Sequence, residues 1–337
     1  MRVLVTGGAG FIGSHLVERL VEDGHHVRVL DNLSSGRREN LAAVFDRVDL
    51  MIGDIRDRGD VAYALRDREA VVHLAAVASV PASMADPAGT HETNFEGTLK
   101  LLDAARRSPV RRFLYASSAA IYGDSAALPL REEVAPMPLS PYAADKLAGE
   151  FYLRFYTERF GLSTTAFRFF NIYGPRQDPS SPYSGVISRF LSAVMAGQPV
   201  RLFGDGRQTR DFVYVADVVE VLVAALSAMV PEFFAVNIGT GREQSLLSLV
   251  ENLEQVLGRP IGRQHEPRRE GDIVRSCADV TRLKRLFGFG CSTTLQTGLG
   301  CLAGAELAAL GLVDSGRETR AVAFDEIALP AQKIEHG

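Results

Sequence analysis

Residues 1–15 read MRVLVTGGAGFIGSH, and this stretch predicts the fold of the first half of the chain. Residues 2–6 are a short run rich in β-branched residues, typical of a buried strand, and the amphipathic sequence after them predicts a helix. Between the two, Gly7 permits a tight turn, Gly10 lets the backbone approach a pyrophosphate, and Gly13 lets the helix pack closely on the strand. The helix N-terminus then presents free N–H groups and a positive dipole end to phosphates. We therefore predict a dinucleotide site with contacts from Gly7, Gly10, Phe11, Ile12 and Gly13.

An acidic residue follows the second predicted strand, residues 26–30. This residue is Asp31, 18 positions after Gly13. A carboxylate there accepts hydrogen bonds from the adenosine ribose hydroxyls and repels a 2′-phosphate, so NAD is favoured over NADP. The neighbouring Arg37 and Arg38 are interpreted as solvated loop residues.

Composition excludes several classes of function. The chain has 337 residues, a hydrophobic content of 46% and a charged content of 23%, which are ordinary values for a globular protein large enough for two lobes. Its net charge of −4, without a basic block, argues against a nucleic acid or membrane partner. Three cysteines without a CxxC pair, and no signal peptide, predict a cytoplasmic protein with neither disulfides nor a metal site.

Strands and helices alternate after the first unit. Further strands are predicted at residues 48–52, 70–74 and 112–116, so the sheet is mostly parallel and ligands bind at the carboxyl ends of its strands. His73 is interpreted as a core residue. Asp54 either accepts a hydrogen bond from the adenine amine or caps a turn. The predicted cofactor contacts beyond the glycine turn are Asp31, Asn32, Asp54, Ile55, Leu74, Ala75, Ala76, Asn94, Tyr142 and Lys146.

Asn94 has two interpretations. It precedes a helical pattern over residues 95–105, so it is either the N-cap of that helix or a cofactor contact.

Tyr142 and Lys146 form the candidate catalytic pair. They are four residues apart at the start of a long predicted helix, so their side chains lie on one face. A free tyrosine has a pKa of about 10, and a nearby ammonium group and a positive nicotinamide ring would both lower it. Such a tyrosine can remove a proton from an alcohol while hydride leaves the same carbon. Ser118, at the end of the fifth strand, completes the set.

The combination of GxxGxxG with YxxxK resembles the short-chain dehydrogenase/reductase superfamily in its extended form, the NAD-dependent epimerase/dehydratase family. The segments LDNLSSG (30–36), HLAA (73–76), RFFNIYGP (168–175) and FGDGRQTRDFVY (203–214) are similar to those of UDP-glucose and UDP-N-acetylglucosamine 4-epimerases. The resemblance covers about residues 1–290. It implies an α/β fold, with a Rossmann-like doubly wound parallel sheet and a smaller, mixed α/β C-terminal substrate lobe.

The resemblance also implies the domain boundaries. Residues 1–172, with 213–240 returning to them, form the NAD-binding lobe. Residues 173–212 and 241–300 form the UDP-sugar lobe, and 301–337 are a tail without predicted chemistry, either a helix packed on the small lobe or a frayed end. Residues 183–197 and 217–228 predict helices, 235–238 an edge strand and 245–257 an amphipathic core helix.

The residues after Ser118 indicate the reaction class. Related dehydratases carry an Asp-Glu pair there and related decarboxylases a glutamate, whereas this chain has Ala119 and Ala120. Ser118, Tyr142 and Lys146 remain, and they suffice for oxidation and re-reduction at C4 of the sugar. The resemblance therefore implies 4-epimerisation with tightly bound NAD that is regenerated in each cycle. The alternatives are UDP-glucuronate 4-epimerisation or decarboxylation and, more remotely, a non-enzymatic NAD-sensing regulator.

The resemblance implies a set of substrate contacts, with Arg210 and Arg269 on the UDP diphosphate and Asp272 on the uridine ribose. Ser276 occupies a position beside the sugar C2 substituent, where a small residue leaves room for an N-acetyl group. We expect UDP-GlcNAc and UDP-GalNAc to fit alongside UDP-Glc and UDP-Gal, while Arg189 or Arg275 could meet a glucuronate carboxylate. The expected substrate contacts are Ser118, Asn171, Val186, Arg210, Arg269, Asp272 and Ser276. The family also implies a homodimer, formed through the helices that begin near Asn94 and Tyr142.

Overall fold

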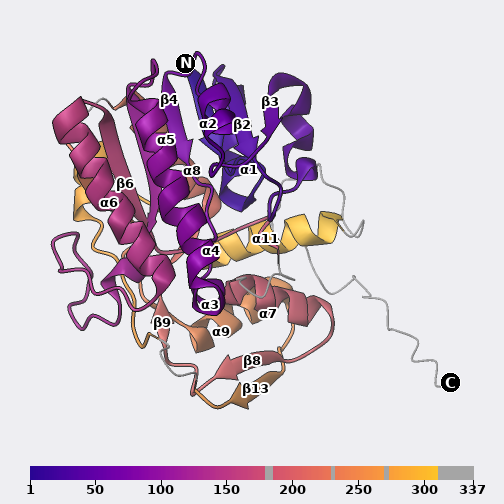
Figure 1. The fold of residues 1–337 in the computed structure, drawn as a ribbon. Coiled ribbons are helices and arrows are strands. Elements are labelled where there is room, and N and C mark those ends of the chain that lie inside the picture. Colours follow the sequence, from indigo (N-terminus) through magenta and orange to yellow (C-terminus); the bar gives the residue numbers. More distant parts are fainter. Residues whose placement is uncertain (179–184, 229–231, 269–272, 310–337) are drawn as a thin grey trace.

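A single seven-stranded parallel sheet forms the centre of the larger lobe (Figure 1). The computed structural model describes residues 1–178, 185–228, 232–268 and 273–309. The strand order is β11-β6-β5-β4-β1-β2-β3, and every neighbouring pair is parallel. The strands are β1 (Arg2–Thr6), β2 (His26–Asp31), β3 (Asp49–Ile52), β4 (Ala70–His73), β5 (Arg112–Ser118), β6 (Ser163–Phe169) and β11 (Phe234–Ile238).

Apolar residues on both faces hold the sheet between two layers of helices. Val3 and Val5 point to one layer and Leu4 to the other, and none of the three is exposed to solvent. A strand covered on both faces requires a continuous apolar run, which is why β1 lacks the polar alternation of a half-exposed strand. These residues therefore anchor the glycine turn that follows β1.

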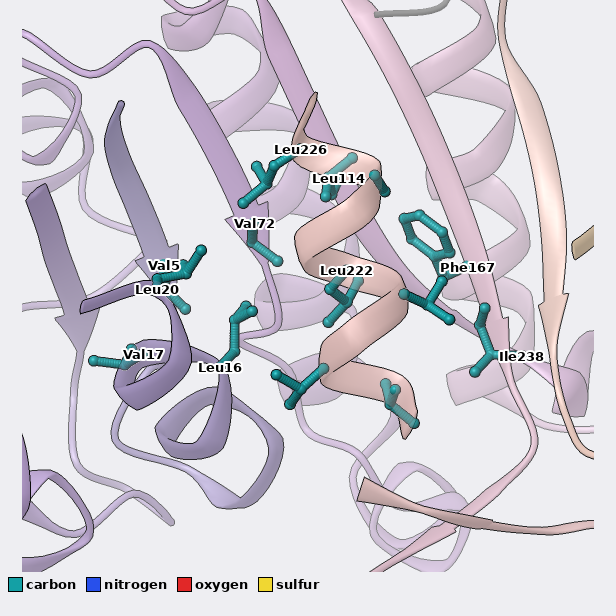
Figure 2. Packing of buried hydrophobic residues seen from close by; sticks show 14 of the residues in the cluster. Val5, Leu16, Val17, Leu20, Val72, Leu114, Phe167, Leu222, Leu226 and Ile238 are labelled. Atoms are coloured by element: carbon teal, nitrogen blue, oxygen red, sulfur yellow. The ribbon is translucent and has the colours of Figure 1, made fainter. Parts of the chain in front are cut away.

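Helices cover both faces of the sheet. α1 (Phe11–Glu22) and α8 (Val215–Ser227) pack on the first face, where Figure 2 shows their leucines meeting side chains of the strands. α2 (Arg58–Ala64), α5 (Thr98–Ala105) and α6 (Pro141–Phe160) pack on the second. The remaining helical segments of this region are η1 (Arg38–Arg47), α3 (Val80–Ala85), α4 (Pro87–His91), η2 (Glu92–Gly97) and η3 (Ala119–Tyr122).

The order of the strands positions the site. The chain runs from β1 outward through β2 to β3, and then crosses to β4 on the other side of β1. The carboxyl ends of β1 and β4 therefore lie at the topological switch point, where open α/β sheets bind their ligands.

A smaller lobe has a separate core, drawn below the sheet in Figure 1. Three helices form it around the parallel pair β8 (Val200–Phe203) and β13 (Arg263–Glu266). The helices are α7 (Val186–Met195), α9 (Leu246–Leu257) and α11 (Leu295–Ala309), while α10 (Thr281–Phe287) packs on the core of the sheet. The short pairs are β7 (Asn171–Tyr173) with β10 (Phe212–Tyr214) and β9 (Thr209–Arg210) with β12 (Gln244–Ser245).

Most predicted elements are confirmed, but β6 of the central sheet and the short strands of the smaller lobe are missed. The structure contains the edge strand at 235–238 and the core helix at 245–257. The first residues of the tail, 301–309, belong to a helix that packs on the small lobe, and the rest of the tail lies outside the described residues. β6 is missed because its sequence, STTAFRF, mixes polar residues into the apolar run. Of the helical stretch expected at 183–197, the structure describes Val186–Met195 as α7. Within the described residues, no helix is both long and apolar enough to cross a membrane.

The expectation that Asn94 opens a helix is wrong. Helical backbone begins at Pro87, where Asp86 accepts the Gly89 amide as N-cap, and it continues to Ala105. Asn94 lies within this run, in the π-helical turn η2. Its side chain instead brackets the backbone of Val77, accepting from the amide at 2.8 Å and donating to the carbonyl at 3.1 Å. A π-helical turn is a common device for directing one side chain at a functional loop.

Candidate active site

A cavity of about 520 Å³ opens at the carboxyl ends of the central strands. Thirteen of the predicted cofactor contacts line it: Gly7, Gly10, Phe11, Ile12, Gly13, Asp31, Asn32, Ile55, Leu74, Ala75, Ala76, Tyr142 and Lys146. Ser118 also lines it, so all three predicted catalytic residues share one cavity with the glycine turn. Asp54 and Asn94 are not among the lining residues.

The glycine turn has the close contacts that its sequence predicts. Gly7 has a φ of +70°, and a Cβ on it would lie 2.7 Å from the Ala75 nitrogen. A Cβ on Gly13 would lie 2.7 Å from the Gly8 Cα, because α1 packs directly on the turn. No side chain caps α1, and Phe11 and Ile12 in its first turn line the cavity. The uncapped amides and the positive helix end fit the pyrophosphate of a dinucleotide such as NAD.

Asp31 is buried and shapes the loop beside the predicted ribose site. Its carboxylate accepts the amides of Ala9 and Leu33, each at 2.9 Å. Burial raises the pKa of Asp31, and these two hydrogen bonds oppose the rise. The carboxylate lines the cavity beside Asn32, where it could meet ribose hydroxyls.

Asp54 is occupied by protein partners. Its carboxylate accepts hydrogen bonds from the Arg56 guanidinium at 2.8 and 3.0 Å and from Asn32 Nδ2 at 3.0 Å. The hydrogen bonds with Arg56 hold the pKa of Asp54 well below its usual range. Arg56 and Ile55 line the cavity, so this turn contributes through residues other than the aspartate.

Tyr142 and Lys146 lie on the same face of α6. Ser140 caps the helix through the Ala143 amide, and Pro141 occupies its first turn, so a standard N-terminus places the pair at the cavity wall. The Lys146 Nζ donates to the Ala116 carbonyl at 2.7 Å and lies 5.8 Å from the centre of the Tyr142 ring.

The electrostatics of this pair differ from the expectation. Burial raises the pKa of Tyr142, and a hydrogen bond with Ser118 opposes the rise. Burial also lowers the pKa of Lys146 to about 7, which weakens the positive charge expected beside Tyr142. The protein alone therefore does not produce the expected lowering of the Tyr142 pKa.

A buried ion pair fixes the helix that carries this pair against the sheet. Arg168 of β6 donates to both carboxylate oxygens of Glu150 on α6, at 3.0 and 2.8 Å. Ser117 of β5 donates to the same carboxylate at 2.5 Å. One network thus connects β5, β6 and α6 immediately behind Ser118.

Most of the predicted substrate residues, unlike the cofactor residues, do not line the cavity. Asn171 is exposed on β7, between Phe170 and Ile172, which do line the cavity. The Arg210 guanidinium donates to the carbonyls of Thr209 and Ile273, at 2.7 and 2.8 Å. Val186 begins α7 and Ser276 is 8% exposed, and neither lines the cavity. Arg269 and Asp272 lie outside the described residues.

Sequence reasoning missed the segment that follows the NIYGP motif. Gln177 lines the cavity, and its Oε1 accepts from Ser188 of α7 at 2.6 Å. Arg176 has a φ of +68° and pairs with Glu18 of α1 at 2.7 Å. Arg37 is exposed, as expected, and also pairs with Asp178 at 2.6 Å. No local pattern announces these contacts, because the partners are far apart in sequence.

His73 is confirmed as a core residue. It is 1% exposed, and its ring nitrogens contact the hydroxyls of Thr6 and Thr98 at 2.6 and 2.9 Å. Among the described residues, no group of three or more His, Cys, Asp or Glu side chains could hold a metal ion.

Comparison with known proteins agrees with this architecture. A model of the NAD dependent epimerase/dehydratase family matches residues 3–239. The UDP-glucose 4-epimerase of Mycolicibacterium smegmatis is 41% identical over 304 residues, which are 89% of this chain and 96% of that protein. The structure of Thermotoga maritima UDP-glucose 4-epimerase with UDP-glucose is similar with a TM-score of 0.87 and 39% identity, covering 92% of this chain and 100% of that one. The UDP-N-acetylglucosamine 4-epimerase of Methanobrevibacter ruminantium M1, in complex with UDP-N-acetylmuramic acid, has a TM-score of 0.87 and 36% identity, covering 91% and 98%.

Proposed function

This chain belongs to the NAD dependent epimerase/dehydratase family, and on that premise we propose that it is a 4-epimerase of UDP-hexoses. The observation that carries the proposal is the presence of Ser118, Tyr142 and Lys146 in one cavity with the glycine turn. Ala119 and Ala120 follow Ser118 in the turn η3, where a dehydratase or decarboxylase of the family would carry an acid. The set therefore supports oxidation and re-reduction without elimination.

The cofactor is NAD, which the glycine turn, Asp31 and the other residues of the cavity wall would hold. When bound, NAD would supply the hydride acceptor and donor for C4 of the sugar, and the positive charge of its oxidised ring would favour the Tyr142 phenolate. We assign Tyr142 as the base that removes the 4-hydroxyl proton. Ser118 hydrogen-bonds the reacting oxygen, and Lys146 orients and stabilises the phenolate. The 4-keto sugar then turns over within the site before hydride returns to its opposite face.

The substrates proposed are UDP-GlcNAc and UDP-GalNAc together with UDP-Glc and UDP-Gal. The smaller lobe, which is built on α7, α9 and α11, would hold the nucleotide, with Asn171, Val186, Arg210, Arg269 and Asp272 as contacts. Ser276 supports the acceptance of an N-acetyl group because its side chain is small. Relatives named for glucose and for N-acetylglucosamine substrates are similar to this chain to nearly the same degree.

The test is proton NMR of the purified protein with UDP-GlcNAc and no added cofactor. Growth of the GalNAc anomeric signal to a stable mixture supports 4-epimerisation with retained NAD. A Ser276→Tyr variant should lose turnover of UDP-GlcNAc and retain that of UDP-glucose. Turnover of UDP-glucuronate alone, or release of carbon dioxide from it, would overturn the hexose assignment in favour of the glucuronate alternatives.

A homodimer is part of the proposal. α6 exposes Phe151 (60%), Tyr152 (39%), Phe155 (47%) and Phe160 (46%), an aromatic surface that a second copy would cover. Light scattering should give twice the 36.6 kDa mass of one chain, and a monomer mass would contradict it.

All three cysteines are free, which fits a reducing cytoplasm.

A further inference from the structure

Asp145 is a buried residue of α6 that directly precedes Lys146 in the sequence. Asp145 is only 5% exposed, and its Oδ1 contacts Nδ1 of His91 on α4 at 2.7 Å. Oδ2 is fully buried and has no hydrogen-bond partner among the described residues. A buried carboxylate oxygen without a donor is costly. Its retention beside Lys146 therefore points to an electrostatic role rather than to packing alone.

Lys146 has neutral direct partners. Its Nζ donates to the Ala116 carbonyl at 2.7 Å and lies 4.9 Å from the centre of the Tyr115 ring. Burial lowers the pKa of Lys146 to about 7, and the negative charge of Asp145 opposes this change. Without that charge, the ammonium would be still less favoured in the cavity.

The other titratable groups near Lys146 are either uncharged or paired with an opposite charge. His73 of β4 faces it, and burial lowers the pKa of His73 to about 3. Burial raises the pKa of Tyr115 on β5 and of Tyr142 on α6. Glu150, one turn further along α6, forms an ion pair with Arg168. Asp145 is thus the negative charge available to Lys146 within the described part of the chain.

His91 holds this carboxylate in position. The His91 side chain is 50% exposed and its ring stacks on Phe95 with 5.2 Å between the ring centres. Because the ring is fixed by stacking, its Nδ1 fixes the orientation of Asp145. The contact joins α4 to α6. His91 is the side chain that holds the Asp145 carboxylate through Oδ1.

We propose that Asp145, clamped by His91, is a positioning residue that favours the ammonium form of Lys146 beside Tyr142. The inference rests on the proposed function for its catalytic meaning. Its physical content is independent of the substrate: removal of the Asp145 charge should let Lys146 lose its proton at lower pH.

The chain is well suited to a direct test, because it contains four lysines: Lys100, Lys146, Lys284 and Lys333. Labelling the lysine Cε with carbon-13 and following the four NMR signals against pH reads the Lys146 titration directly, with Lys146→Met assigning its signal. In Asp145→Asn the Lys146 midpoint should fall by about one pH unit, the effect expected of losing one nearby charge in a partly desolvated site. An unchanged midpoint in a folded variant would overturn the proposal.

Two further variants keep the test decisive. Asp145→Ser also removes the charge, and its hydroxyl can bond to its own helix backbone, so it serves if Asp145→Asn does not fold. It should lower the Lys146 midpoint in the same way. Glu96→Gln is the matched control, because Glu96 is an exposed acid 3.5 Å from Lys100. It should leave the Lys146 signal unchanged; a Lys146 shift as large as in Asp145→Asn would count against the assignment.

The pH dependence of kcat in the NAD-loaded enzyme supplies a second readout. Loss of the Asp145 charge should move the alkaline limb to lower pH, because Lys146 then deprotonates earlier. If no UDP-sugar is epimerised, the proposed function fails while the lysine titration still decides this inference. If epimerisation occurs and neither the titration nor the alkaline limb moves, this inference alone fails.

Discussion

Lys146 and Tyr142 lie one turn apart on α6, with the Nζ of the lysine 5.8 Å from the centre of the tyrosine ring. The lysine is anchored by the Ala116 carbonyl of β5 rather than by the tyrosine hydroxyl. This leaves the Tyr142 hydroxyl available to Ser118 and to a substrate alcohol in the same cavity. The strand that ends in Ser118 and the helix that carries Tyr142 therefore meet at one reacting point.

Tyr142→Phe should reduce kcat by about 10²- to 10⁴-fold, the usual contribution of a positioned acid–base group. The ring remains in the cavity wall, so NAD content after purification should not change. Tyr152→Phe is the matched control, since Tyr152 is a half-exposed tyrosine on the same helix. Comparable losses in both variants would show that the Tyr142 hydroxyl has no special role.

Gly13→Ala should destabilise the protein and remove its NAD. The new Cβ would meet the Gly8 Cα at 2.7 Å and the Gly7 carbonyl carbon at 2.9 Å, both backbone atoms that cannot move aside. Overpacking of this kind costs about 1–3 kcal/mol. Gly300→Ala is the control, because a Cβ there meets nothing within 4 Å and adds helix propensity. Measured by NAD absorbance and thermal unfolding, equal behaviour of the two variants would contradict the close packing of α1.

Glu150→Gln should lower the free energy of unfolding by about 3 kcal/mol, because it leaves the buried Arg168 without its charge partner. Both residues are buried, at 4% and 6% exposure. Glu158→Gln, an exposed acid on the same helix, should stay within about 0.5 kcal/mol of the native protein. The chain has no tryptophan, so urea unfolding is followed by circular dichroism. A loss no larger than that of Glu158→Gln would refute the role of the ion pair.

His73 should make stability depend on pH below about 6.5. Thr98 donates its proton to the Asn94 carbonyl, so His73 Nε2–H donates to Thr98 and Nδ1 accepts from Thr6. This arrangement requires a neutral ring, and burial lowers the pKa of His73 from 6.5 to about 3. The unfolded chain therefore binds the extra proton between these two values, and the free energy of unfolding falls as the pH drops through that range.

Between pH 6.5 and 5 this loss amounts to about 2 kcal/mol. His73→Gln retains a donor and an acceptor but does not titrate. Its unfolding free energy should therefore start lower at pH 7 and fall less steeply. Parallel pH profiles for the native protein and the variant would exclude His73 as the source.

The sequence by itself determined the order of the central elements and the nature of the site. Five central strands, the helix after the glycine turn and the edge strand at 235–238 follow from local apolar patterns, and the structure contains them. Gly7, Gly13, Tyr142 and Lys146 could be identified because a tight turn, a close approach or a helical spacing is encoded over a few residues. β6 escaped detection because its serine and threonines are buried only by neighbouring elements of the fold, so its sequence lacks the apolar pattern of a buried strand.

Only the tertiary structure decided how these groups are held. Asn94 supports Val77, Arg37 pairs with Asp178, and Gln177 enters the cavity from beyond the sheet, none of which is encoded locally. Burial also reverses the charge expectation for the catalytic pair, since it raises the pKa of Tyr142 and lowers that of Lys146. Desolvation depends on everything that surrounds a group, and for that reason the residues could be named from the chain while their protonation could not.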